Sequence, residues 1–95
     1  MLFALMCTDK PGHLQVRLDT RPDHLAFLES LGDALKFAGP FLGEDGKPCG
    51  SMVMVEAADE DAALAIADRD PYAKAGLFSA VEARPWVWAV KNPEA

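Results

Sequence analysis

The segment "SMVMVEA", residues 51–57, constrains the fold of this chain more than any other. In a β-strand, successive side chains point to opposite faces of the sheet. One face of this strand carries a serine and two valines, and the other carries two methionines and a glutamate. Because both faces are mostly apolar, neither face of the sheet can be freely solvated over its whole length. Helices or another molecule must therefore cover each face.

A first helix is predicted to begin at "TRPDHL", after a short segment, residues 14–19, that extends a strand or forms a loop. Thr20 can cap this helix, Pro22 suits its first turn, and Asp23 completes an approximate capping box. Its buried stripe repeats at intervals of four, three and four residues: His24, Leu28, Leu31 and Leu35.

The other segments predict three more strands and a second helix. The apolar run 1–7 and the segment 37–42 read as strands, and a hairpin turn at Asp45–Gly46 leads into the strand at 51–57. The second helix is capped by Asp59 and ends at Asp70, because Pro71 disfavours helical geometry in the residue before it. The last strand, within 76–90, contains Pro85, which indicates a sheet edge.

This order of elements, βαββαβ, predicts an α+β fold of the ferredoxin-like type. Two helices cover one face of a four-stranded antiparallel sheet, and a single domain over residues 1–95 suits the chain length. The other face stays apolar, and Trp86 and Trp88 on the last strand would be exposed there. A second copy of the chain is the simplest cover, so we expect a homodimer.

Composition excludes several classes of function. The net charge is −6 with no cluster of Lys or Arg, which argues against nucleic acid and anionic membranes as partners. Cys7 and Cys49 have no metal-ligand spacing, and we expect both to be free, buried thiols in a reducing cytoplasm. The N-terminal apolar run is too short for a signal peptide or a membrane span. No nucleotide-binding or metal motif occurs, so we expect neither a cofactor nor a metal.

His24 and Asp70 are the candidate catalytic residues. His24 lies on the apolar stripe of the first helix, and Asp70 continues the buried stripe of the second. If the two meet, the carboxylate fixes one tautomer of the imidazole and leaves the other ring nitrogen free as an acid or base. Spacing alone leaves open whether they meet, and a structural His–Asp pair would give the same sequence.

Four further residues are candidates for binding a substrate. Ser51 follows Gly50, which permits a close approach of the backbone, and can hydrogen-bond a ligand. Arg17 and Arg21 flank the entrance to the first helix and can hold a carboxylate, which makes a small anionic molecule the expected ligand. Tyr72 can line the same cavity. Turn chemistry, surface exposure and packing are the respective structural alternatives.

Several short motifs occur in an order that resembles the YciI-like (YCII-related) family over nearly the whole chain. They are "R-x-x-HL" at 21–25, "AGP" at 38–40, "G-x-x-x-GS" at 46–51, "DPY-x-x-AGLF" at 70–78 and "RPW" at 84–86. The resemblance implies a ferredoxin-like dimeric α+β barrel with a His–Asp pair in a cleft. Carried over to this chain, the pair is His24 and Asp70, with Ser51 in the matching GS position, and Arg21 is a firmer match than Arg17.

Three functions stay open at this point. The leading hypothesis is a cofactor-independent lyase or isomerase, since some similar proteins act on chlorinated or lactone-type ring-cleavage acids. In it, His24 transfers a proton, Asp70 orients His24, and Ser51 and Arg21 position a small anionic metabolite. The second is a non-catalytic dimer that binds or senses a small molecule in the same cleft. The third is a module whose apolar sheet face binds another protein.

Overall fold

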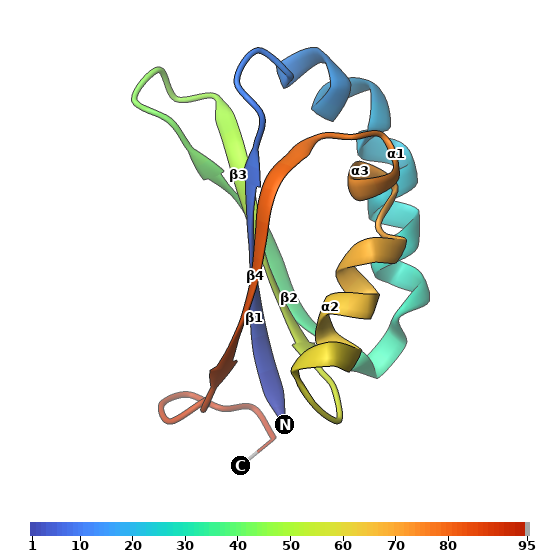
Figure 1. Ribbon diagram of the computed structural model, residues 1–95. Coiled ribbons are helices and arrows are strands. Elements are labelled where there is room, and N and C mark those ends of the chain that lie inside the picture. Colours follow the sequence, from blue (N-terminus) through green and yellow to red (C-terminus); the bar gives the residue numbers. More distant parts are fainter. Residues whose placement is uncertain (95) are drawn as a thin grey trace.

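The computed structural model describes residues 1–94 and confirms the βαββαβ arrangement (Figure 1). Ala95, the last residue of the predicted domain, lies outside the described residues. One antiparallel sheet has the strand order β2-β3-β1-β4, with β1 Leu2–Asp9, β2 Leu35–Leu42, β3 Pro48–Glu56 and β4 Phe78–Trp86. The helices are α1 Leu14–Ser30, α2 Glu60–Arg69 and α3 Pro71–Lys74, with a 3-10 turn, η1, at Gly32–Ala34.

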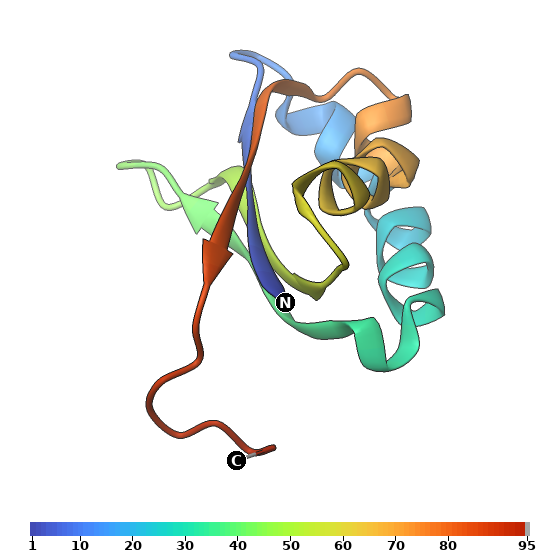
Figure 2. The ribbon, with the colours of Figure 1, turned by 60° about the horizontal axis from the view of Figure 1, so that its bottom comes forward.

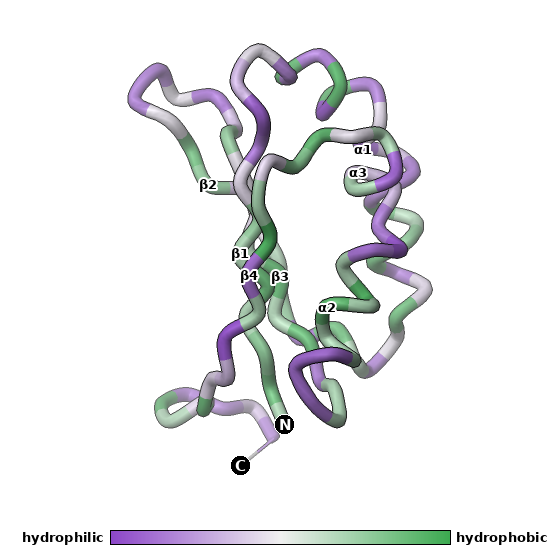
Figure 3. The backbone as a smooth tube through the Cα atoms, viewed as in Figure 1, coloured by the Kyte–Doolittle hydropathy of each residue, from purple (hydrophilic) through white to green (hydrophobic). Residues whose placement is uncertain are grey.

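The helices lie on one side of the sheet only (Figures 1 and 2). Alternate residues of the two central strands face them, and tube colouring by hydropathy shows the apolar stretches of these strands (Figure 3). Side chains from the sheet and from the helices together form the buried core between the two layers: Phe3, Leu5, Cys7, Leu28, Val53, Val55, Ala63, Ala67 and Ala83. Within residues 1–94, none of the helices combines the length and apolar character needed to cross a membrane.

The predicted start of the first helix is wrong, because α1 begins at Leu14 and not at Thr20. Pro22 therefore lies inside the helix, where it lacks the N–H for the bond to the carbonyl four residues earlier. Pro22 is exposed, so water can solvate that carbonyl, and the ribbon of α1 changes direction along its length (Figure 1). The earlier start places Arg17 on the helix, one turn before Arg21 and two turns before His24.

The predicted end of this stripe is also wrong. Leu31 is the C-cap of α1, and Leu35 is the first residue of β2. Helical spacing continued across the turn by coincidence, because Gly32 adopts a positive φ of 57° that ends the helix. Both leucines still pack against the core, from other elements.

The second helix follows the prediction closely. The Asp59 side chain accepts a hydrogen bond from the amide of Ala62 at 2.8 Å, and the helix ends at Asp70. The short helix α3 was not predicted. Asp70 caps it by accepting a hydrogen bond from the amide of Tyr72 at 2.9 Å. One residue thus ends α2, begins α3 and keeps its carboxylate in the interior.

The last strand is an edge strand, as Pro85 predicted. It ends at Trp86, so Trp88 lies beyond it, and both tryptophan rings contact Phe37 of β2 edge to face. The sheet face away from the helices carries the methionines of β3, and a hollow there of about 370 Å³ is lined in part by Met52, Met54 and Trp86. This is the face for which the sequence predicted a cover.

Both cysteines are free, but only Cys7 is buried. Cys49 is exposed, which corrects the expectation of two buried thiols. It stands next to Gly50, where β3 passes so close to β1 that a Cβ on Gly50 would collide with the carbonyl oxygen of Cys7. The side chain of Cys49 is left outside this contact.

Candidate active site

His24 and Asp70 meet in the interior, between α1 and the junction of α2 with α3. The Nδ1 atom of His24 lies 2.9 Å from each carboxylate oxygen of Asp70, and the two side chains are only 8% and 6% exposed. The predicted juxtaposition is therefore present. It depends on Pro71, which turns the chain at Asp70 so that the carboxylate points toward α1.

The geometry defines the proton positions on the imidazole. A carboxylate can only accept hydrogen bonds, so Nδ1 of His24 carries the hydrogen and donates it to Asp70. In the neutral ring, Nε2 then holds a lone pair. Nε2 makes no hydrogen bond within residues 1–94, and His24 lines a cavity, so this nitrogen is available to a ligand.

Tyr72 holds the imidazole from one side. The two rings are stacked, with centroids 3.9 Å apart and planes inclined by 15°. The guanidinium carbon of Arg17 lies 4.7 Å from the centroid of the Tyr72 ring. Tyr72 is 2% exposed, and burial raises its pKa, with Arg17 acting in the opposite direction and Asp70 adding to the effect of burial. The phenol is therefore neutral at ordinary pH.

Arg17, Asp9 and Ser51 form a second polar cluster beside the pair. Arg17 donates from Nε and from one terminal nitrogen to the two oxygens of Asp9, at 2.7 and 2.8 Å. The same terminal nitrogen donates to the hydroxyl oxygen of Ser51 at 3.0 Å. Burial lowers the pKa of Arg17, but the hydrogen bond and charge of Asp9 outweigh it, so the pKa lies above its ordinary value. Arg17 is thus a permanent cation.

Sequence reasoning missed Asp9. It lies two residues beyond the apolar run 1–7, which is the extent of the first predicted strand. In the structure it is the last residue of β1, and its side chain is 7% exposed. The alternation along the first strand could have indicated it, because Asp9 follows Phe3, Leu5 and Cys7 at every second position and so faces the helices with them.

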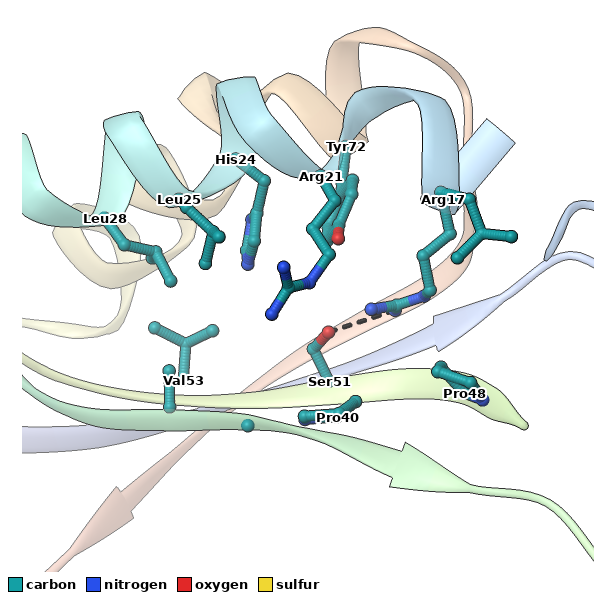
Figure 4. Close-up of a pocket in the computed structure, with 13 residues that line it drawn as sticks. Arg17, Arg21, His24, Leu25, Leu28, Pro40, Pro48, Ser51, Val53 and Tyr72 are labelled. Carbon is teal, nitrogen blue, oxygen red and sulfur yellow. Dashed lines mark hydrogen bonds between the residues drawn. The ribbon is translucent and has the colours of Figure 1, made fainter. Parts of the chain in front are cut away.

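A cavity of about 210 Å³ opens between α1 and the β2–β3 half of the sheet (Figure 4). The side chains of Arg17, Arg21 and His24 descend into it from α1, with Ser51 on the opposite wall (Figure 4). Most of its remaining lining is apolar: Leu18, Leu25, Leu28, Ala38, Gly39, Pro40, Pro48, Val53 and Tyr72. A few polar groups converging on an apolar cavity are typical of sites for small molecules.

All six residues predicted for the site line this cavity or contact a residue that does. Asp70 contacts His24, and the other five are on the cavity wall. The two arginines differ in their surroundings, because Arg17 is buried and paired with Asp9 while Arg21 is exposed. Within residues 1–94, no group of three or more His, Cys, Asp or Glu side chains is placed to hold a metal ion.

Comparison with known proteins connects the chain to one family. The family profile described as "YCII-related domain" matches residues 1–87. "Protein YciI" of Escherichia coli O6:H1 is 38% identical over 94 residues, covering 90% of this chain and 96% of that protein. An "Uncharacterized protein" of Haemophilus influenzae is 33% identical, with the same coverage.

Solved structures agree with the fold. The 5-chloro-2-hydroxyhydroquinone dehydrochlorinase TftG of Burkholderia phenoliruptrix, in complex with 2,5-dihydroxybenzoquinone, is 39% identical. It superposes with a TM-score of 0.83 over 92% of this chain and 94% of TftG. A NIPSNAP family protein of Agrobacterium tumefaciens is 17% identical, with a TM-score of 0.56 over 97% of this chain and 95% of that one, and is similar in fold alone.

Proposed function

This chain belongs to the YCII-related family, and from that premise we propose that it is a cofactor-independent acid/base enzyme of the lyase or isomerase type. One observation carries the proposal: a buried carboxylate engages Nδ1 of His24, and the ring lines an apolar cavity with Nε2 unoccupied. Similarity to a dehydrochlorinase at 39% identity supports an elimination as the reaction.

In the proposed reaction, His24 acts first as a base. Its Nε2 takes a proton from the substrate, the electron pair left behind forms a new π bond, and chloride or another leaving group departs with its bonding pair. No electrons are gained or lost overall, and the proton on Nε2 afterwards passes to water, so the step requires no group beyond these side chains. The carboxylate of Asp70 stabilises the imidazolium, and a positioned base of this kind contributes about 10²- to 10⁴-fold in rate.

The proposed substrate is a small, anionic ring compound with oxygen substituents. The lining of leucines, prolines and Val53 suits a flat apolar body, and the cavity of about 210 Å³ limits its size. Arg21 supplies a positive charge at the wall, and within residues 1–94 it has no carboxylate within 4.0 Å. An acidic group on the substrate can take that place.

The test is turnover by His24 variants. Chloride release from 5-chloro-2-hydroxyhydroquinone and from a panel of small chlorinated ring acids is measured for wild type, His24→Gln and His13→Gln. His13, the other histidine, bonds the carbonyl of Pro11 outside the cavity and is the matched control. We expect His24→Gln to lose at least about 10²-fold in rate and His13→Gln to keep its activity. Equal turnover by all three proteins would eliminate the proposed role.

The same panel addresses the alternative, a binding or sensing protein. A compound that binds wild type and raises its melting temperature, yet is recovered unchanged, would favour that alternative. In that case His24→Gln should weaken binding less than substitutions of the other residues that line the cavity.

We also propose that the chain forms a homodimer through the sheet face that lacks helices. Met6 and Met52, which are half-buried, and Trp86, which is 37% exposed, give this face its apolar character. Light scattering on the purified protein should give about twice the 10.2 kDa chain mass. Met52→Asp should shift the protein toward the monomer, whereas a monomeric wild type contradicts the proposal.

A further inference from the structure

The polar cluster of Asp9, Arg17 and Ser51 lies beside the His–Asp pair and reaches the cavity wall. We propose that Asp9 is a positioning residue that holds Arg17 against Ser51, so that the Ser51 hydroxyl donates its hydrogen to an acceptor oxygen of the ligand. This inference rests on the proposed function for its choice of site, and it assigns the ligand's acidic group to Arg21.

Arg17 uses most of its hydrogen-bond donors within the protein. Three of its five N–H bonds are used by Asp9 and Ser51, in contacts of 2.7 to 3.0 Å. Asp9 also compensates its charge, and the pair is 4% and 7% exposed. The two parallel hydrogen bonds of this bidentate pair fix its geometry. The pair also stays together, because separating the partners would leave an uncompensated charge in the interior. Arg17 therefore acts as a rigid donor to Ser51.

That donation determines the direction of the Ser51 hydroxyl. Its oxygen accepts from Arg17, so its own hydrogen must point elsewhere. Ser51 is 3% exposed, and within residues 1–94 its hydroxyl donates to no other group. It lines the cavity opposite α1 (Figure 4). A buried donor with no acceptor costs free energy, and a ligand oxygen in the cavity removes that cost.

The two arginines consequently have different tasks. Arg17 is neutralised by Asp9, whereas Arg21 lies one turn further along α1, on the same cavity wall, and has no ion pair within residues 1–94. The ligand class that satisfies both groups carries a carbonyl or deprotonated oxygen at Ser51 and an acidic group near Arg21. A fully apolar ring would leave the Ser51 donor unpaired.

A double-mutant cycle tests the positioning role without any need for turnover. Binding of 2,5-dihydroxybenzoquinone, the molecule bound to the related dehydrochlorinase, is measured by calorimetry. The proteins are wild type, Asp9→Asn, Ser51→Ala and the double variant. Asp19→Asn is the matched control, because Asp19 is an exposed aspartate on α1 whose carboxylate accepts a hydrogen bond from Gln15. If Asp9→Asn fails to fold, Arg17→Lys replaces it, since lysine keeps the charge and loses the bidentate geometry.

We expect Asp9→Asn and Ser51→Ala each to weaken binding about tenfold, and the double variant to bind about as weakly as Ser51→Ala alone. Arg17→Lys combined with Ser51→Ala should show the same non-additivity, and Asp19→Asn should bind like wild type. Losses that multiply, or a loss of thermal stability in Asp9→Asn with unchanged binding, would overturn the inference, as would a wild-type protein that does not bind the probe. A protein that shows the coupling but never turns over a substrate contradicts the proposed function and leaves this inference standing.

Discussion

The imidazole of His24 lies flat against the ring of Tyr72, with centroids 3.9 Å apart and an angle of 15° between the planes. This stack and the hydrogen bond to Asp70 restrain the imidazole in two perpendicular senses. The carboxylate fixes rotation within the ring plane, and Tyr72 fixes the plane itself. Nε2 therefore has one direction in which to meet a ligand.

Two substitutions of Tyr72 distinguish the contribution of its ring from the contribution of its hydroxyl. Tyr72→Phe keeps the stack, so we expect the free energy of unfolding to stay within about 1 kcal/mol of wild type and turnover to stay within about threefold. Tyr72→Leu removes the flat surface and leaves a cavity, which should cost about 2–4 kcal/mol and about tenfold in rate. Urea denaturation and substrate turnover measure the two effects. Equal activity of both variants would show that the stack does not hold His24 in place.

Asp70→Asn should abolish most of the activity while leaving the fold intact. The amide can donate to Nδ1 and so favours the tautomer with the hydrogen on Nε2, which cannot act as a base. We expect a fall in rate of about 10²- to 10⁴-fold and a loss of stability of about 1–3 kcal/mol, since Asp70 also caps α3. Asp68→Asn changes an exposed carboxylate on the same helix and is the control. A rate unaffected by Asp70→Asn would mean that the pair is structural.

Gly50 fixes the position of Ser51 through a backbone contact. A Cβ at Gly50 would collide with the carbonyl oxygen of Cys7 on the neighbouring strand. Backbone cannot move aside cheaply, so Gly50→Ala should destabilise the protein by about 2–4 kcal/mol and weaken ligand binding by moving Ser51. Gly39→Ala on β2 is the matched control, because a Cβ there has nothing within 4 Å and should change stability by less than about 1 kcal/mol. Comparable midpoints of thermal unfolding for the two variants would contradict this reading of Gly50.

The sheet and the second helix were accessible from the sequence because their signals are local. A strand with two apolar faces, a turn at Asp45–Gly46, a cap at Asp59 and a proline after Asp70 each act within a few residues. The start of α1 was not accessible from the sequence. Pro22 is typical of the first turn of a helix, and its local preference is overridden here by packing. Local signals favoured the wrong boundary.

The candidate site was predicted as a set of residues but not as a geometry. His24 and Asp70 are 46 positions apart, and only the packing of α1 against α3 brings them together. Asp9 was missed for a related reason: its role depends on Arg17 being helical, and residues 14–19 were not assigned to a helix. Long-range pairing of polar side chains follows from tertiary packing, for which a single sequence has no periodic signal.

The two cysteines should differ in reactivity and in their effect on stability at high pH. Burial, together with the charge of Asp70, raises the pKa of Cys7 from 9.0 to about 12, whereas Cys49 is exposed. A thiol reagent at pH 8 should therefore modify one cysteine per native chain and two in denaturant, and Cys49→Ser should leave none reactive in the native protein.

Above pH 9 the unfolded chain loses the Cys7 proton before the folded chain does. The free energy of unfolding should therefore fall between about pH 9 and pH 12, by on the order of 4 kcal/mol at most. Cys7→Ala lowers stability at all pH values but should lack this part of the slope, so parallel pH profiles for wild type and Cys7→Ala would contradict the assignment.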